Sequence, residues 1–187
     1  GKTNLETIWG EGIGTETYDQ VVTSMSTSDG GFLVGGKKNT SESITLENGI
    51  VIDSQNNSYI IKYDSNGRVD WAHSLGDMYD DRQTKYMDFS ETSDGGYLVA
   101  GSMFGTLDLG NNITLKSYGS YDGVIIKYNS DGVCEWAKNV GTISNDQFRA
   151  ITSTSDGGFI VGGYIKYANL QLDSDTTINV DYVSGED

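Results

Sequence analysis

The sequence contains no proline among its 187 residues, so none of its turns can use the fixed φ angle of that residue. Its 25 glycines, together with Asn and Asp, must make the turns instead, because these residues tolerate positive φ angles. Cysteine is nearly absent, and the single Cys134 excludes an internal disulfide bond. This usage fits both the cytoplasm and many secreted bacterial proteins. No apolar run approaches the roughly 18 residues that a membrane-spanning helix needs.

Basic residues are also scarce. The chain has 12 Lys and Arg against 27 Asp and Glu, which gives a formal net charge of −15. Such a surface repels phosphate backbones and anionic membranes, so a nucleic-acid partner is excluded. Solubility is the simplest explanation of the charge, and the alternatives are cation binding or attraction of a basic partner. With 36% hydrophobic and 11% aromatic residues, the chain can still build an ordered core.

One decapeptide occurs three times in this sequence. It reads TSDGGFLVGG from Thr27, TSDGGYLVAG from Thr92 and TSDGGFIVGG from Thr154, at spacings of 65 and 62 residues. A second motif, out of phase with the first, reads DSNGRVDWAHSLG from Asp64 and NSDGVCEWAKNVG from Asn129. Such periods indicate a repeat architecture. A residue that recurs in every unit is more often structural than functional.

The second unit shows the predicted strands most completely. After a hairpin turn at residues 94–96, apolar strands are predicted at 97–100 and 124–128, and a last strand is predicted at 134–140. A looser stretch, 101–123, separates the first two. With the strand that precedes the turn, each unit has four strands in an antiparallel meander.

Consecutive apolar positions in the strands FLV and YIIKY indicate burial on both faces, because successive side chains of a strand point to opposite sides. A four-stranded sheet covered on both faces by similar sheets is the arrangement of a β-propeller blade. An immunoglobulin-like sandwich needs about 100 residues, and a solenoid has a shorter period. We therefore expect an all-β fold of four-stranded antiparallel meanders repeated every 62–65 residues, forming a partial β-propeller of about three blades.

The phase of the repeats predicts the boundaries. Each Trp of the last strand is followed by Gly five residues later, and an Asp follows that Gly after five more: Trp9 and Asp19, Trp71 and Asp81, Trp136 and Asp146. Within one propeller fragment, 1–187, the predicted parts are a last strand of a preceding or closing blade at 1–14, blades at 15–76 and 77–141, and an incomplete blade at 142–187. Three blades are fewer than a closed propeller has. Either further repeats or assembly of copies would complete a ring.

The runs GGYLVAG and DGVIIKYNSDGVCEWAKNVG resemble bacterial β-propeller repeats of the seven-bladed type, from about Leu5 to about Tyr164. This resemblance implies a large secreted or surface-attached bacterial protein of unspecified role. The outline from Asp64 to Trp71 also resembles tryptophan-docked propellers of quinoprotein dehydrogenases and outer-membrane assembly lipoproteins. That second resemblance implies that the Trp packs between adjacent blades, and it carries over no quinone or metal ligands.

Two groups of Asp residues are candidate sites. Asp19, Asp81 and Asp146 are expected to head each first strand and accept backbone N–H bonds, with a ring of carboxylates around a calcium ion as the alternative. Asp29, Asp94 and Asp156 of the decapeptides are expected to be scaffold residues of hairpin turns. The runs from Asp64 and Asn129 resemble the start of a calcium loop, but their twelfth positions are Leu75 and Val140, so a hairpin turn is favoured.

No residue is assigned to catalysis or to a cofactor. His73 has no repeated partner and is expected in an exposed polar position, while Cys134 aligns with Val69 and is expected to be buried. No G-x-S-x-G elbow is present. The sequence thus favours a protein that is not an enzyme.

Aromatic residues outside the expected core suit recognition of proteins or sugars, with loop packing as the alternative. They are Tyr79, Tyr86, Phe104, Tyr118, Tyr121, Tyr164 and Tyr167. We expect a non-catalytic binding or adhesion module, secreted or on a bacterial cell surface, with a protein or glycan ligand. The alternatives are an assembly unit that completes a propeller by oligomerisation, and a fragment of a propeller-type carbohydrate-active enzyme.

Overall fold

The computed structural model describes residues 19–38, 42–53, 57–76 and 87–166, together with two short strands at 170–171 and 177–178. All regular elements in these segments are β-strands, so the described part of the chain has no helix that could cross a membrane. The all-β prediction is confirmed. Trp9 and Asp81 lie outside the described residues.

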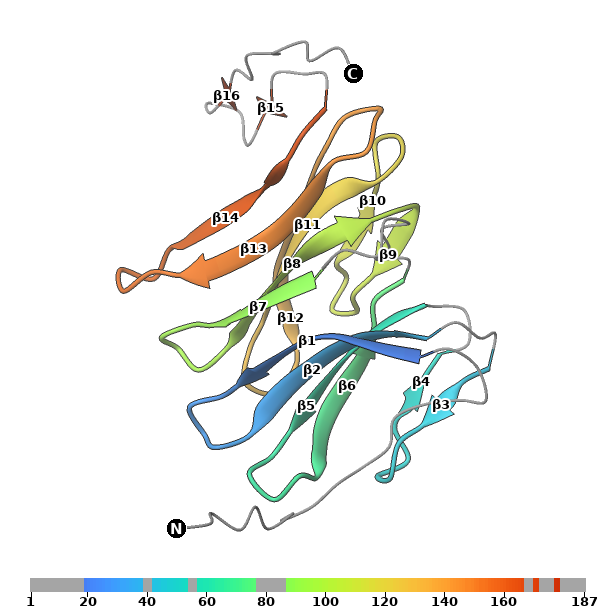
Figure 1. Ribbon diagram of the computed structural model, residues 1–187, viewed down its shortest axis with the longest axis vertical. Helices are drawn as coiled ribbons and strands as arrows, with labels where there is room; N and C mark the ends of the chain where they lie inside the picture. Colours follow the sequence, from blue (N-terminus) through green and yellow to red (C-terminus); the bar gives the residue numbers. More distant parts are fainter. Residues whose placement is uncertain are drawn as a thin grey trace, which may run out of the picture.

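Two four-stranded antiparallel sheets form the body of the molecule (Figure 1). The first has the order β1-β2-β5-β6, with β1 (Asp19–Ser26), β2 (Phe32–Lys38), β5 (Ser58–Tyr63) and β6 (Val69–Ser74). The second has the order β7-β8-β11-β12, with β7 (Met87–Glu91), β8 (Tyr97–Met103), β11 (Asp122–Tyr128) and β12 (Cys134–Val140). Both are meanders of four strands, as the repeat pattern predicts.

A two-stranded hairpin is inserted between the second and third strands of each sheet. These hairpins are β3 (Ile44–Thr45) with β4 (Val51–Ile52) and β9 (Thr106–Asp108) with β10 (Thr114–Lys116). The stretch 101–123 is therefore more regular than expected, because its alternating leucines form a hairpin that buries Leu107 and Leu109. The third unit contains β13 (Gln147–Ser153) paired with β14 (Phe159–Tyr164), followed by β15 (Leu170–Gln171) and β16 (Thr177–Ile178).

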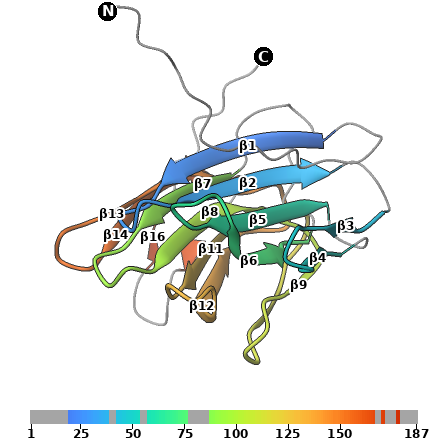
Figure 2. The same ribbon diagram turned by 90° about the horizontal axis from the view of Figure 1, so that it is seen from below.

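The three units stack side by side, with the first strand of each against the next (Figures 1 and 2). Between β7 and β13, Asp88 accepts a hydrogen bond from the backbone N–H of Ile151 at 3.0 Å, and Ser90 accepts one from Ser153 N at 2.8 Å. These bonds join residues 63 positions apart. Residues one sequence period apart therefore lie side by side in neighbouring sheets.

Apolar side chains fill the spaces between the units. One cluster joins Leu33 and Ile60 of the first sheet to Val99 and Ile126 of the second, and another joins Leu98 of the second sheet to Ile151 of β13. Every residue of β5, β8 and β11 is consequently buried. This confirms the predicted burial on both faces for these three strands, whereas Phe32 and Val34 in the FLV run of β2 are only half-buried.

The third copy of the decapeptide behaves differently. Phe159 and Ile160 of β14 are 39% and 63% exposed, whereas Leu33 and Leu98, which are equivalent to Ile160, are 0% and 1% exposed. The expected burial on both faces is therefore wrong for β14. In the described part of the chain β14 pairs with β13 alone, so neither a third strand nor a further sheet covers it.

Trp71 and His73 of β6 join the first sheet to the second. The indole Nε1–H of Trp71 donates to Ser130 O at 3.1 Å, and the Nε2–H of His73 donates to Gly132 O, 2.6 Å away. The His73 ring also stacks on Tyr128, with ring centroids 5.0 Å apart. The expected exposed position of His73 is therefore wrong, because the β11–β12 turn of the next unit covers it. Trp71, 8% exposed, packs between the two sheets.

Candidate functional site

The three copies of the TSDGG sequence form hairpin turns on one side of the molecule. They connect β1 to β2, β7 to β8 and β13 to β14, and they project together at the left in Figures 1 and 2. The inserted β3–β4 and β9–β10 hairpins lie at the other end of the strands (Figure 1). We call residues 27–31, 92–96 and 154–158 the TSDGG turns.

Each TSDGG turn is closed by its own Asp. In the first, Asp29 Oδ1 accepts hydrogen bonds from the Thr27 hydroxyl and from Gly31 N at 2.9 Å. The same pair of bonds recurs at Asp94 and at Asp156. Because a carboxylate satisfies the turn's donors, the three aspartates have the local geometry of scaffold residues.

Two of the three turns also bind a buried lysine. Lys62 Nζ lies 2.7 Å from Asp29 Oδ2, 3.5 Å from Asp70 Oδ2 and 2.9 Å from Tyr63 O. Its side chain is 1% exposed. A buried ammonium group is tolerated only where anions and carbonyls surround it, and this arrangement provides both.

The second sheet repeats this arrangement. Lys127 Nζ lies 3.1 Å from Asp94 Oδ1, 3.2 Å from Glu135 Oε2 and 3.2 Å from Tyr128 O. Bonds from Lys62 and Thr27 lower the pKa of Asp29 to about 2, and bonds from Thr92, Gly96 and Lys127 lower the pKa of Asp94 to about 2. Both turns therefore keep an ionised carboxylate well into acid.

The lysines were missed from the sequence. The signal that could have found them is a lysine in each of the apolar strands YIIKY and VIIKY, 33 residues after the turn Asp in both units. A charged residue inside a strand buried on both faces needs a partner, and the repeat offers an acid at the same phase.

An open groove of about 460 Å³ runs along the TSDGG turns of all three units. It is lined by Ser28, Glu91, Thr92, Ser93, Gly95, Ser153, Thr154 and Ser155. Glu91 links the first two units, because its carboxylate accepts hydrogen bonds from Ser28 N at 2.8 Å and Ser28 Oγ at 2.6 Å. The Glu91 carbonyl accepts a third bond from Ser153 Oγ, also at 2.6 Å. The groove is thus held by side chains from every unit.

The chemistry of this groove is that of hydroxyls around one acid. Of its described lining residues, Glu91 alone carries a charge. The hydroxyls can donate or accept, and the carboxylate favours a cationic or hydrogen-bond-donating ligand. One carboxylate does not provide the acid and base pair that glycoside hydrolysis uses.

Of the three aspartates predicted to form a carboxylate ring, Asp19 and Asp146 lie in the described residues and Asp81 does not. Asp146 is fully buried, and its carboxylate accepts hydrogen bonds from the backbone N–H groups of Thr142 and Lys166. Asp19 begins β1 directly opposite Lys38, whose buried side chain donates to Glu42 O at 3.1 Å. In the segments that the structure describes, no three or more His, Cys, Asp or Glu residues form a group that could hold a metal ion.

The candidate aromatic residues lie apart from the groove. Phe104 and Tyr118 are 49% and 70% exposed, and Phe104 contacts Tyr121 with ring centroids 5.5 Å apart. They lie beside the β9–β10 hairpin, at the opposite end of the strands. Tyr164 lies under the Arg149 guanidinium, 5.1 Å from its ring centroid. Tyr79, Tyr86 and Tyr167 are outside the described residues.

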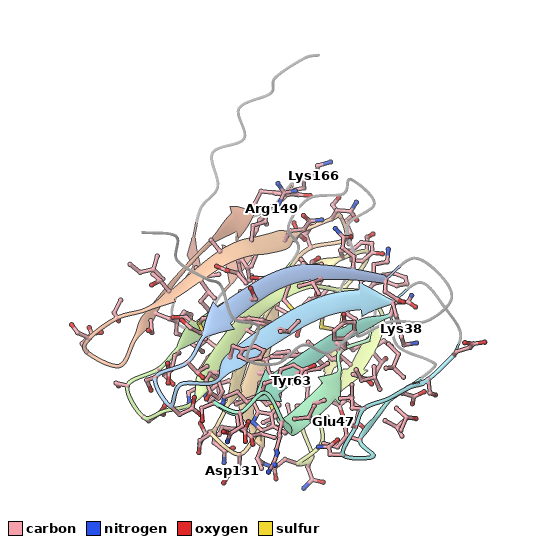
Figure 3. All side chains as sticks on the ribbon, turned by 60° about the horizontal axis from the view of Figure 1, so that its bottom comes forward. Lys38, Glu47, Tyr63, Asp131, Arg149 and Lys166 are labelled. Carbon is pink, nitrogen blue, oxygen red and sulfur yellow. The ribbon has the colours of Figure 1, made fainter. Side chains whose placement is uncertain are left out.

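Figure 3 shows where labelled charged side chains lie. Arg149 and Lys166 lie together beside β13 and β14, whereas Glu47 and Asp131 lie at the far side of the first and second units. None of the described residues that line the groove is a Lys or an Arg.

The remaining candidates have structural positions. The carboxylate of Asp64 accepts hydrogen bonds from Asn66 N and Arg68 N, both at 2.8 Å, which closes the predicted hairpin turn. Asn129 does the same for Asp131 and Val133. Cys134 is 2% exposed in the core, as predicted, and burial raises the pKa of its thiol to about 11.

No protein-family model matches the chain. It is 28% identical over 170 residues to the regulatory protein FlaEY of Caulobacter vibrioides, an alignment that covers 89% of this chain and 17% of that protein. The chain thus spans about a sixth of the length of this relative.

Proposed function

We propose that the chain is part of a β-propeller and acts as a non-catalytic binding or adhesion module, secreted or on a bacterial cell surface. In this proposal the two four-stranded sheets are blades and β13–β14 begins a third. Sheets of equal strand order that stack through their first strands support the blade interpretation.

The observation that carries the binding proposal is the groove along the TSDGG turns. It spans three units, and its volume of about 460 Å³ lies in the usual range for ligand sites. Its lining offers hydroxyls and Glu91 but no aromatic ring on which a sugar would stack. We infer a protein ligand that presents a Lys or Arg side chain to Glu91, in keeping with the net charge of −15.

The similar protein of C. vibrioides is named a regulatory protein. Calcium is a separate proposal, and three of the candidate carboxylates already have partners: backbone donors at Asp146 and lysine at Asp29 and Asp94.

The test is binding of the purified chain to arrays of basic, neutral and acidic peptides and to a glycan array. Ser93→Trp should abolish binding by filling the groove, and Glu91→Gln should weaken binding of basic peptides and reduce its dependence on salt. Tyr118→Ser, at the opposite end of the strands, is the matched control and should bind normally.

Two results would contradict the proposal. The first is binding that Tyr118→Ser abolishes and Ser93→Trp leaves intact, which would place the site among the exposed aromatic residues. The second is no binding on any array. Binding to glycans alone would replace the proposed protein ligand by a sugar.

A further inference from the structure

The third TSDGG turn has the residues of the other two but lacks their surroundings. In the first and second units, the strand after the turn pairs with a third strand that carries a lysine: Leu33 is opposite Lys62, and Leu98 is opposite Lys127. Asp156 keeps its bonds with Thr154 and Gly158, yet no lysine among the described residues binds it. Among the described residues, Asp156 therefore lacks the lysine that binds its counterparts Asp29 and Asp94.

The second glycine of each turn is the next observation. A Cβ atom on Gly31 would overlap Tyr63 O and lie 2.7 Å from Lys62 Nζ, and one on Gly96 would overlap Lys127 Nζ and Tyr128 O. The third strand therefore approaches Gly31 and Gly96 too closely for any residue that has a Cβ atom. On Gly158 the nearest atoms would be Thr154 Oγ1 at 3.0 Å and Asp156 Oδ1 at 3.3 Å, both in its own turn. Gly158 makes room for a strand that the described structure does not contain.

The edge of β14 is the place where this strand would pair, because β13 is its one partner among the described residues. Ile160 is 63% exposed, although Leu33 and Leu98 at the same position are covered. A strand edge with free backbone groups beside exposed apolar side chains is a template for pairing with another strand. The acid and the glycine are two independent features that fit one occupant, whereas Leu33 and Leu98 are covered by a neighbouring sheet, so the exposure of Ile160 reports a different uncovered face.

We propose that the free edge of β14 is the docking site for a β-hairpin from a further repeat unit, whose first strand carries a lysine that binds Asp156. The hairpin continues the β13–β14 sheet in antiparallel register. Its lysine lies opposite Ile160 and its next aromatic residue lies opposite Phe159, as Tyr63 lies opposite Phe32. This proposal does not depend on a ligand in the groove.

A second copy of this chain does not fit as the occupant. Its two described hairpins of this pattern, at 58–74 and 122–140, are already built into complete sheets. The occupant is therefore a hairpin of the same chemistry that is not yet paired, and self-association becomes an outcome of the test.

The test uses a synthetic hairpin with the sequence of residues 58–74, which contains no cysteine. Its binding to the whole chain is measured by titration calorimetry, and the contact is mapped by amide chemical shifts of β14. We expect saturable binding, weakened about tenfold when the peptide carries Lys62→Met, because a charge-assisted bond to Asp156 is lost. With Asp156→Asn in the chain, the two peptides should bind equally.

Gly158→Ala provides a test independent of charge. It should block the peptide, since its Cβ would meet the carbonyl of the incoming aromatic residue, and should destabilise the chain far less than the same change at Gly96, because its closest contacts are side-chain oxygens of its own turn. Gly96→Ala is the matched variant that should destabilise the chain itself. No saturable binding, or binding insensitive to both Lys62→Met and Gly158→Ala, would overturn the proposal. So would self-association in sedimentation with which the peptide does not compete.

Discussion

Lys62 reaches the TSDGG turn 33 residues before it, and its Nζ lies 2.7 Å from Asp29 Oδ2. The lysine is buried, whereas the aspartate side chain is 54% exposed. This contact fastens the third strand of the sheet to the turn between its first two strands, and Lys127 repeats it at Asp94.

The three turn aspartates provide a matched set of variants. Asp29→Ala and Asp94→Ala should each lower the free energy of unfolding by about 1 to 2 kcal/mol, a range discounted for solvent screening at half-exposed carboxylates. Asp156→Ala should cost clearly less, because no described lysine depends on it. Urea denaturation measures all three, and equal losses would contradict the role given to the lysines.

Acid stability should depend on the same carboxylates. Their folded pKa of about 2 lies below the ordinary value of 3.8, so the stabilisation is fully present above about pH 4 and is lost as the pH falls toward 2. Lys62→Met removes the largest cause of the shift at Asp29. The variant should lose less stability between pH 4 and pH 2 than the parent chain, as followed by thermal melts. An unchanged slope would argue against the pair.

The stability of the chain should also depend on the protonation of His73, a base whose charged form is disfavoured by burial. Burial lowers the pKa of His73 below its ordinary value of 6.5. The unfolded chain therefore binds a proton more readily, and stability should fall as the pH drops below about 6.5 and through the folded pKa. His73→Gln should flatten the melting temperature over this interval, since the chain has no other histidine. A profile that keeps its slope in the variant would assign the effect elsewhere.

Gly132 of the second unit packs against the Trp71 ring of the first, so a larger residue at Gly132 should disturb the contact between the two units. This residue has a φ of +78°, and a Cβ there would lie 2.6 Å from the Trp71 ring. Gly132→Ala should therefore cost roughly 2 to 4 kcal/mol, through backbone strain and overpacking together. Gly157→Ala is the control, with a φ of +87° and no atom within 4 Å of the added Cβ. Similar losses in both would mean that the Trp71 contact adds nothing.

Calcium should not change the thermal stability of the chain through the described segments. Asp146 is occupied by backbone donors, and Asp29 and Asp94 are occupied by lysine. We expect the same melting temperature with excess calcium and with a chelator, and no heat in calorimetric titration. A rise in melting temperature with calcium would restore the carboxylate ring as a metal site.

How far the sequence predicts this structure depends on the range of each interaction. Consecutive apolar residues in β8 and β11 predict burial on both faces, and the structure agrees for these two strands. Ile160 has the same local sequence as Leu33, yet it is exposed, since burial depends on which sheet lies next to the strand. Local pattern and tertiary neighbours must agree before burial follows.

The candidate site was less predictable than the fold. The groove needs Glu91 of one unit beside Ser28 of another, and a period gives the spacing of units without their relative placement. His73 was misplaced for the same reason, because its cover comes from the carbonyl of Gly132, 59 residues away. The buried lysines of β5 and β11 depend in the same way on turn aspartates 33 residues earlier in the chain.

The burial of Cys134 makes the chain convenient for site-directed labelling. A thiol reacts as its thiolate, and at neutral pH a group that is 2% exposed with a pKa of about 11 supplies almost none. A cysteine introduced at Ser93, an exposed position in the groove lining, would then take up a maleimide dye selectively. The native cysteine could stay in place, so a fluorescent reporter of groove occupancy needs only one substitution.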